Sequence, residues 1–235
     1  MSDTTRVAIV TGAGRGMGAA CARELASKGW KLGLLSPSGS AETLAASLGG
    51  LGFKGSVESA DDLERLVKTT ADKFGRIDGV VVSLGGPPKG ELLQISDQDW
   101  LRGAEMVVLS VVRLARLVTP IMQRQKGGSI VNISTFAAYE PDPAFPVSST
   151  YRAGLGSFTK LYADRYAADG IRMNNILPGY IDSAQTKSEI VQRIPMRRYG
   201  KVQEIARTAA FLLSDDAGYI TGQNLRVDGG LTRSV

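Results

Sequence analysis

The segment VAIVTGAGRGMG, residues Val7–Gly18, decides the fold of this 235-residue chain. Four apolar residues typical of a buried strand run into a turn that holds four glycines, and apolar residues then resume with helical spacing. Gly12 permits the tight turn, Gly16 lets the backbone approach an anion, and Gly18 lets the helix pack closely. The amide groups at the start of this helix, around Met17, are free to bind phosphate. We therefore expect the loop to hold the pyrophosphate of a dinucleotide.

Composition excludes several classes of chemistry. Hydrophobic residues make up 43% of the chain and charged residues 22%, so a full core can form without disulfides or metal. Cys21 is the one cysteine, which excludes an internal disulfide and a cysteine-cluster metal site. The chain has no histidine, and a Ser-His-Asp hydrolase, a zinc hydrolase or a histidine base each needs one.

Charge and hydropathy limit the partners. The net charge is +5, but the basic residues are scattered among acids, so we expect an anionic small molecule and no nucleic acid. No apolar run is long enough to span a bilayer, and the first strand begins too near Met1 to leave room for a signal peptide. The expectation is a single-domain cytoplasmic protein with no membrane partner.

Short β-branched or leucine-rich runs alternate with longer segments of helical period, the pattern of repeated βαβ units. The expected strands are Arg6–Thr11, Lys31–Leu35, Gly52–Gly55, Gly79–Ser83, Ser129–Ser134, Arg172–Ile176 and Asn224–Val227. The expected helices are Gly16–Lys28, Ala41–Leu48, Ala60–Phe74, Asp97–Gln123, Ser148–Ala168 and Gln203–Leu213. The sequence predicts a Rossmann-type, doubly wound α/β fold whose ligands bind beyond the carboxyl ends of the strands.

Several motifs resemble the short-chain dehydrogenase/reductase family, and 3-oxoacyl-acyl-carrier-protein reductases in particular. The likeness spans nearly the whole chain. It rests on the Thr-Gly-x-x-x-Gly-x-Gly spacing from Thr11, on Phe74–Asp78, on Gly128–Ser134, on Pro178-Gly179 and on Thr221–Gly230. The resemblance implies seven parallel strands in the order 3-2-1-4-5-6-7, a nicotinamide cofactor, a small carbonyl or alcohol substrate, and a homotetramer or homodimer.

The end of the second strand bears on the choice of cofactor. An acid there would accept the ribose hydroxyls of NAD and repel a 2′-phosphate, but this chain has Ser36. Arg15 occupies a position that in the family often pairs with that phosphate, and a guanidinium suits it well. We expect NADP(H) in preference to NAD(H), the alternative being that Arg15 is only a solvated loop residue. Ser56 stands where the family usually has an adenine-binding Asp.

The resemblance also carries over further cofactor contacts. Pro178 and Gly179 introduce a segment in which Ile181 takes the place of the residue that meets the nicotinamide carboxamide by its backbone. Ser183 takes the place of the hydroxyl that meets the pyrophosphate. The usual Asn-Ala-Gly after the fourth strand is Ser83-Leu84-Gly85 here, and Ser83 and Gly85 are expected to border the cofactor.

The family's four catalytic positions carry different residues in this chain. Alignment without gaps places Thr135 at the serine, Ser148 at the tyrosine, Arg152 at the lysine and Val107 at the asparagine. Thr135 keeps a hydroxyl that can orient a carbonyl, whereas Ser148 lacks an acidic proton and Val107 has no polar group. Arg152 is a permanent cation one helical turn after Ser148 and could hold the nicotinamide ribose or, in an acid- or sugar-processing enzyme, a substrate carboxylate.

Three tyrosines are alternative proton donors. Tyr151 lies about 60° round the helix and ~4.5 Å further along than the expected tyrosine place, so its use requires a shifted substrate. Tyr139 and Tyr180 follow the fifth and sixth strands and could enter the pocket, although for each of them the role of a partly buried packing residue is favoured. Two functions remain open: an NADP(H)-dependent oxidoreductase with a replaced catalytic set, or a noncatalytic dinucleotide-binding sensor, scaffold or partner subunit.

Overall fold

A seven-stranded parallel sheet forms the centre of the protein. The computed structural model describes residues 5–183 and 186–234. The order β3-β2-β1-β4-β5-β6-β7 confirms the expected Rossmann-type arrangement. All strands are parallel, and the order in which the chain adds them reverses between β1 and β4. The strands are β1 Val7–Thr11, β2 Lys31–Ser36, β3 Leu51–Lys54, β4 Gly79–Val82, β5 Gly128–Ile133, β6 Ile171–Pro178 and β7 Asn224–Val227.

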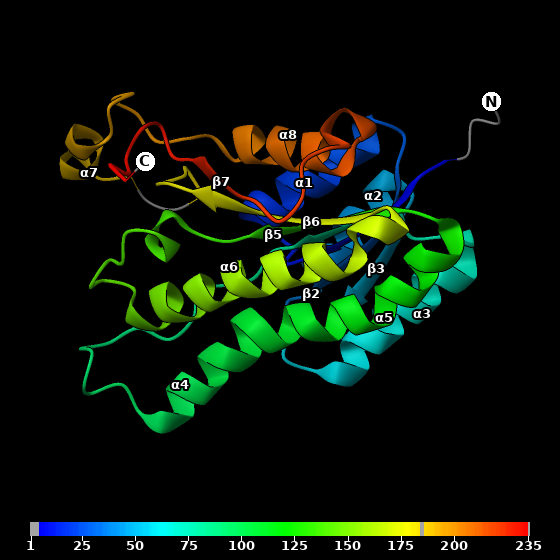
Figure 1. Cartoon of the computed structure of the whole chain (residues 1–235), viewed down its shortest axis with the longest axis horizontal. Helices are drawn as coiled ribbons and strands as arrows, with labels where there is room; N and C mark the ends of the chain where they lie inside the picture. Colours follow the sequence, from blue (N-terminus) through cyan, green and yellow to red (C-terminus); the bar gives the residue numbers. More distant parts are fainter. Residues whose placement is uncertain (1–4, 184–185, 235) are drawn as a thin grey trace.

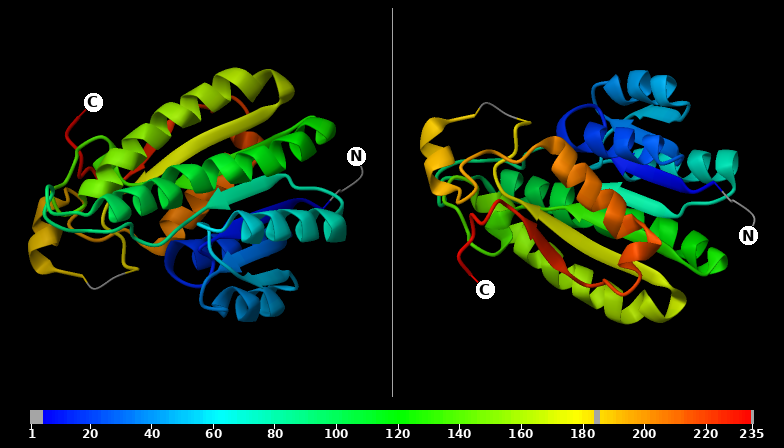
Figure 2. Two further views of the ribbon diagram at one scale, coloured as in Figure 1. Left: turned by 90° about the horizontal axis from the view of Figure 1, so that it is seen from below. Right: turned by 90° about the horizontal axis from the view of Figure 1, so that it is seen from above.

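Helices cover both faces of the sheet (Figures 1 and 2). One face carries α1 Gly16–Ser27, α2 Ser40–Leu48 and α8 Val202–Leu213. The other carries α3 Ala60–Phe74, α5 Ser110–Gln125 and α6 Pro146–Tyr166, with α4 Asp97–Ala104 ahead of α5. A six-residue helix, α7 Ser188–Arg193, lies with the loops beyond the carboxyl ends of the strands.

The period of two along each strand produces two hydrophobic cores. All five residues of β1 are buried. Ala8 and Val10 face the α1, α2 and α8 layer, whereas Ile9 faces α3, α5 and α6. A strand buried on both faces must be apolar throughout, which explains the continuous run of apolar residues at the start of the sequence.

Capping side chains define the starts of two helices. Ser59 accepts a hydrogen bond from the Asp62 amide at 3.2 Å ahead of α3, and Ser96 accepts one from the Asp99 amide at 3.1 Å ahead of α4. Both helices also carry acids in the first turn, where a negative charge interacts favourably with the helix dipole. The helix start expected at Asp97 is confirmed.

The predicted boundaries differ from the structure at several points. The single helix expected over Asp97–Gln123 is interrupted by a π-helical turn, Glu105–Leu109, which separates α4 from α5 and contains Val107. The helix expected from Ser148 begins at Pro146, because proline fits the first helical turn. The short helix α7 was not among the helices expected from the sequence. No helix in the described ranges has the length and apolarity required to cross a membrane.

Candidate functional site

The loops after β1 and β4 meet where the strand order reverses. The Thr11 hydroxyl donates to the Ser83 carbonyl at 2.7 Å and accepts from the Ser83 amide at 3.1 Å. This reciprocal pair is buried and fixes the two loops side by side. Ser83 is buried with both its backbone groups used by Thr11, while the space around Gly85 is open.

The glycines of the first loop are required by its geometry. Gly12 and Gly16 have φ of 58° and 56°, a region that side chains disfavour. A Cβ on Gly12 would lie 2.6 Å from the Ser83 carbonyl oxygen, and one on Gly18 would lie 2.3 Å from the Gly12 carbonyl oxygen. The loop is consequently a closely packed cradle of backbone in which a side chain at Gly12 or Gly18 would clash with neighbouring carbonyl groups.

The N-terminus of α1 is left free to bind an anion. Arg15 precedes the helix in an extended conformation, no side chain caps the first-turn amides, and that turn holds no acid. This contrasts with α3 and α4, whose first turns have both. A Cβ on Gly16 would lie 3.4 Å from the Ser183 Cβ, so the segment after β6 reaches the same loop. The uncapped amides, the cradle and the Ser183 hydroxyl fit a pyrophosphate.

Serines and one arginine surround the end of β2. The Ser36 side chain is buried, and its oxygen accepts a hydrogen bond from the Ala41 amide at 3.0 Å. Ser40, whose hydroxyl lies 2.7 Å from that of Ser38, packs against Gly14 beside Ser36. Arg15 is exposed, and its side chain forms no hydrogen bond or ion pair within the described ranges. Sequence reasoning selected Ser36 and missed Ser40, which the start of the second helix brings back to the loop.

The segment after β6 presents a free backbone. Gly179 packs so closely on Asp228 that a Cβ there would lie 2.8 Å from the Asp228 Cα. Ile181 forms a parallel bridge with Gly200, in which the Gly200 amide donates to Tyr180 and the Asp182 amide donates to Gly200. The amide and carbonyl of Ile181 point to the other side, and neither is used in the described structure. They are suited to an amide ligand.

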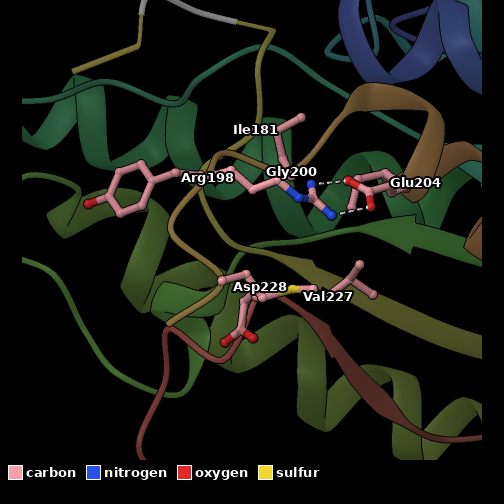
Figure 3. A pocket seen from close by; sticks show the side chains of 10 residues that line it. Ile181, Arg198, Gly200, Glu204, Val227 and Asp228 are labelled. Carbon is pink, nitrogen blue, oxygen red and sulfur yellow. Dashed lines mark hydrogen bonds and ion pairs between the residues drawn. The ribbon is translucent and has the colours of Figure 1, made fainter. Parts of the chain in front are cut away.

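A cavity of about 90 Å³ lies beneath this bridge (Figure 3). Ile181 and Val227 line it, and Arg198 pairs with both carboxylate oxygens of Glu204 at 2.8 Å. These bonds and the Lys201 amide lower the pKa of Glu204 to about 2. The cavity is far smaller than the roughly 300 Å³ of a ligand pocket, so we interpret this part as a support for the segment after β6.

Thr135 and Ser148 lie on neighbouring elements. Thr135 follows β5, is partly buried, and accepts a weak hydrogen bond from the Ala137 amide at 3.4 Å. Ser148 is in the first turn of α6 and partly buried. Val107, at the asparagine place, is fully buried in the π-helical turn.

Arg152 is a buried cation with few partners. Its side chain is 6% exposed, and Nη1 donates to the Ile133 carbonyl at 2.5 Å. Burial lowers its pKa to about 10. Across the described residues its Nε has no acceptor and no acid is paired with the guanidinium. Such a charge is costly unless a ligand compensates it.

The three candidate phenols have different surroundings. Tyr151 packs between α4 and α6 against Trp100, with ring centroids 5.9 Å apart. Tyr139 is 50% exposed and lies under the Arg226 guanidinium. Tyr180 packs on Phe136, next to Thr135, at a centroid distance of 5.4 Å, and its hydroxyl donates to Asp142 Oδ2 at 3.5 Å.

The sheet order, the glycine cradle and the free helix N-terminus define a Rossmann-type dinucleotide-binding protein. The model of the family described as enoyl-(acyl carrier protein) reductase matches residues 12–232. The chain belongs to the short-chain dehydrogenase/reductase family of oxidoreductases.

Relatives include the 3-oxoacyl-[acyl-carrier-protein] reductase of Synechocystis sp., which is 37% identical over 97% of both chains. The enzyme of the same name from Haemophilus influenzae, FabG, is 34% identical over 96% of this chain and 98% of its own. The crystal structure of YwfH, an NADPH dependent reductase involved in bacilysin biosynthesis, superposes with a TM-score of 0.93. It covers 98% of this chain and all of its own, and at 24% identity it supports the fold alone.

Proposed function

We propose that the protein is an NADP(H)-dependent reductase that interconverts a small carbonyl compound and its alcohol, with Thr135, Ser148 and Arg152 in place of the usual serine, tyrosine and lysine. The observation that carries the proposal is the uncapped N-terminus of α1 behind a loop that only glycine can form. The bound cofactor would supply or accept the hydride, and the protein would supply position and electrostatics.

The proposed contacts follow from the geometry of the loops. The amides of Gly16, Met17 and Gly18 and the hydroxyl of Ser183 would bind the pyrophosphate. Ile181 would meet the carboxamide through its unused backbone groups. Pro178 ends β6 and Gly179 turns the chain so that this segment reaches the loop.

The preference for NADP(H) is proposed on the surroundings of Arg15. Gly14, the residue before the exposed Arg15, packs against Ser36 and Ser40, and the Ser40 hydroxyl lies 2.7 Å from that of Ser38. A guanidinium and hydroxyl groups are donors suited to a phosphate. The Ser36 side chain is buried and held by the Ala41 amide, whereas Ser40 is partly exposed, so we assign Ser36 the lesser part and Ser40 the greater. Glu42, in the first turn of α2, packs beside Gly39. It is not at the end of β2, where an acid would repel the 2′-phosphate of NADP(H).

Thr135 and Arg152 are the groups proposed to act on the substrate side. Among the described residues the Thr135 hydroxyl makes one weak hydrogen bond, as an acceptor, and it is free to donate to a carbonyl oxygen. Arg152 would hold the nicotinamide ribose, or a carboxylate of the substrate, and in doing so would gain the partner that its buried Nε lacks. The names of the relatives make 3-oxoacyl thioesters the first substrates to test. We propose a homodimer or homotetramer, which light scattering would test.

The experiment compares binding and turnover for the two nicotinamide cofactors. We expect NADPH to bind more tightly than NADH and to be oxidised with at least one member of a panel of 3-oxoacyl thioesters, ketones and aldehydes. In Arg15→Ala the preference should fall by roughly tenfold or more, because one charge-assisted contact of about 1.5–3 kcal/mol is lost. The matched control is Arg23→Ala, which removes an exposed arginine on the outer side of α1.

Two results would overturn the proposal. Tight NADPH binding with no turnover across the panel would favour a noncatalytic sensor or scaffold. An equal preference in Arg15→Ala and wild type would remove Arg15 from the recognition of the phosphate.

A further inference from the structure

The replaced catalytic set leaves a chemical requirement unmet. Hydride addition to a carbonyl carbon forms one C–H bond and moves the π electron pair to oxygen, which must then gain one proton. NADPH, which the proposed function supplies, is oxidised to NADP⁺ in the same step. Neither Ser148 nor Thr135 is an acid of suitable strength, because aliphatic hydroxyls ionise far above a phenol. The proton must come from another group.

Tyr180 stands on the segment after β6, which the proposed function places against the nicotinamide carboxamide. It follows Gly179 directly, and its neighbour Ile181 turns its free backbone toward the proposed carboxamide position. The Tyr180 ring packs on Phe136, whose neighbour in the chain is Thr135. The phenol therefore lies against the short turn that presents the Thr135 hydroxyl.

Asp142 ties the same phenol to the start of α6. Its carboxylate Oδ2 accepts the Tyr180 hydroxyl at 3.5 Å, and Oδ1 accepts the Ala144 amide at 2.9 Å. The Asp142 amide donates to Ser149 Oγ at 3.4 Å, one residue from Ser148. Tyr180 is thus linked to both elements that carry the replaced catalytic residues.

The other two phenols are engaged elsewhere. Tyr151 is held between α4 and α6 by Trp100 and Gly103. Tyr139 stacks under Arg226 of β7 and is half exposed. Of the three, Tyr180 has a carboxylate partner and a contact with the residue next to Thr135.

We propose that Tyr180 is the proton donor of the reaction, with Asp142 as the residue that positions it; this rests on the proposed reductase function. The phenol O–H bond breaks as the new alcohol O–H bond forms, and solvent returns the proton to the phenolate after each turnover. Asp142 accepts the hydroxyl in the resting state and so holds the phenol beside the start of α6.

The groups around the phenol keep it protonated at neutral pH, and the carboxylate does so by making it a weaker acid. Burial and the Asp142 carboxylate raise the pKa of Tyr180, while Arg193 on α7 acts in the opposite direction. Tyr199, with a ring centroid 6.0 Å away, is the other titratable group packed against it. The phenol is consequently protonated at neutral pH and able to donate. A fall in reduction rate is expected as the pH rises through this pKa.

The test compares three single substitutions that each remove one hydroxyl: Tyr180→Phe, Tyr139→Phe and Tyr151→Phe. We expect Tyr180→Phe to lower kcat by roughly 10²- to 10⁴-fold, the usual worth of a general acid, with NADPH affinity unchanged. The two controls should stay close to wild type. In Asp142→Asn the alkaline limb of the rate profile should move to lower pH, because the charge that raises the phenol pKa is gone.

A second readout needs no cofactor. The ultraviolet difference titration between wild type and Tyr180→Phe isolates this phenol among the seven tyrosines. Asp142→Asn should shift that titration to lower pH. Wild-type turnover that survives Tyr180→Phe, or an unshifted titration, would overturn this inference alone. Absence of turnover in the wild-type protein would overturn the proposed function and the donor role together.

Discussion

Replacing Arg152 with methionine is predicted to stabilise the ligand-free protein and to weaken its binding of NADPH. Burial lowers the pKa of this guanidinium from 12.5 to about 10, which corresponds to a cost of about 3 kcal/mol for the charged form, at about 1.4 kcal/mol for each pH unit. No acid among the described residues repays that cost.

The hydrogen bond to Ile133 offsets part of the penalty. A bond from a charged donor contributes about 1.5–3 kcal/mol, and its loss also leaves the Ile133 carbonyl without this partner. Methionine has a similar length and no charge. The expected net gain is about 1 kcal/mol, which raises Tm by roughly 2–4 °C for a chain of this size.

Thermal unfolding measured by circular dichroism with and without NADPH provides the assay. A ligand at about 100 times its Kd adds about 2.7 kcal/mol, and a tenfold loss of affinity would remove about half of that. Arg152→Lys, which keeps a cation, is the control and should retain the larger response. The reasoning fails if Arg152→Met destabilises the ligand-free protein by more than about 2 kcal/mol, or if NADPH stabilises all three proteins equally.

Two further predictions concern the phosphate loop and α8. Gly18→Ala should lower NADPH affinity and stability, because the new Cβ would lie 2.3 Å from the Gly12 carbonyl oxygen. The control Gly154→Ala, whose Cβ would have no atom within 4 Å, should stabilise α6 by up to about 1 kcal/mol. Calorimetric titration with NADPH and thermal unfolding measure the two effects, and equal effects of the two substitutions would contradict the prediction. The Glu204 carboxylate, whose pKa is lowered to about 2, contributes stability that is present above its ordinary value of 4.5 and is lost as the pH falls through about 2. Glu204→Gln should therefore cost more stability at pH 7 than at pH 2 in urea unfolding, by a modest amount because the pair is exposed, and a pH-independent cost would refute the assignment.

Local patterns in the sequence predict most of the fold. Continuous apolar runs such as the one in β1 identify strands buried on both faces, and Ser96 identifies the start of α4 through its capping hydroxyl. The π-helical turn at Val107 leaves no comparable signal, because its wider spacing depends on how the helix packs against α6. The six-residue α7 is too short to show a helical period.

Part of the candidate site is also predictable, because it too depends on local sequence patterns. The roles of the glycines in the first loop can be predicted from the sequence, since these roles depend only on the small size and the conformational freedom of glycine. The directions of Ser36, Tyr139, Tyr151 and Tyr180 depend on tertiary packing. Ser36 turns inward to bind the Ala41 amide, and Tyr180 alone of these tyrosines meets a carboxylate. The link between Tyr180 and Asp142 joins residues 38 positions apart, which no local pattern reveals.

The most direct test of the central claim is the transfer of deuterium from NADPH labelled at C4 to a carbonyl substrate, followed by mass spectrometry of the product. The proposed hydride transfer predicts an alcohol that carries one deuterium on the former carbonyl carbon. An alcohol without the label, or labelled NADPH that is bound but never consumed by any member of the panel, would contradict it.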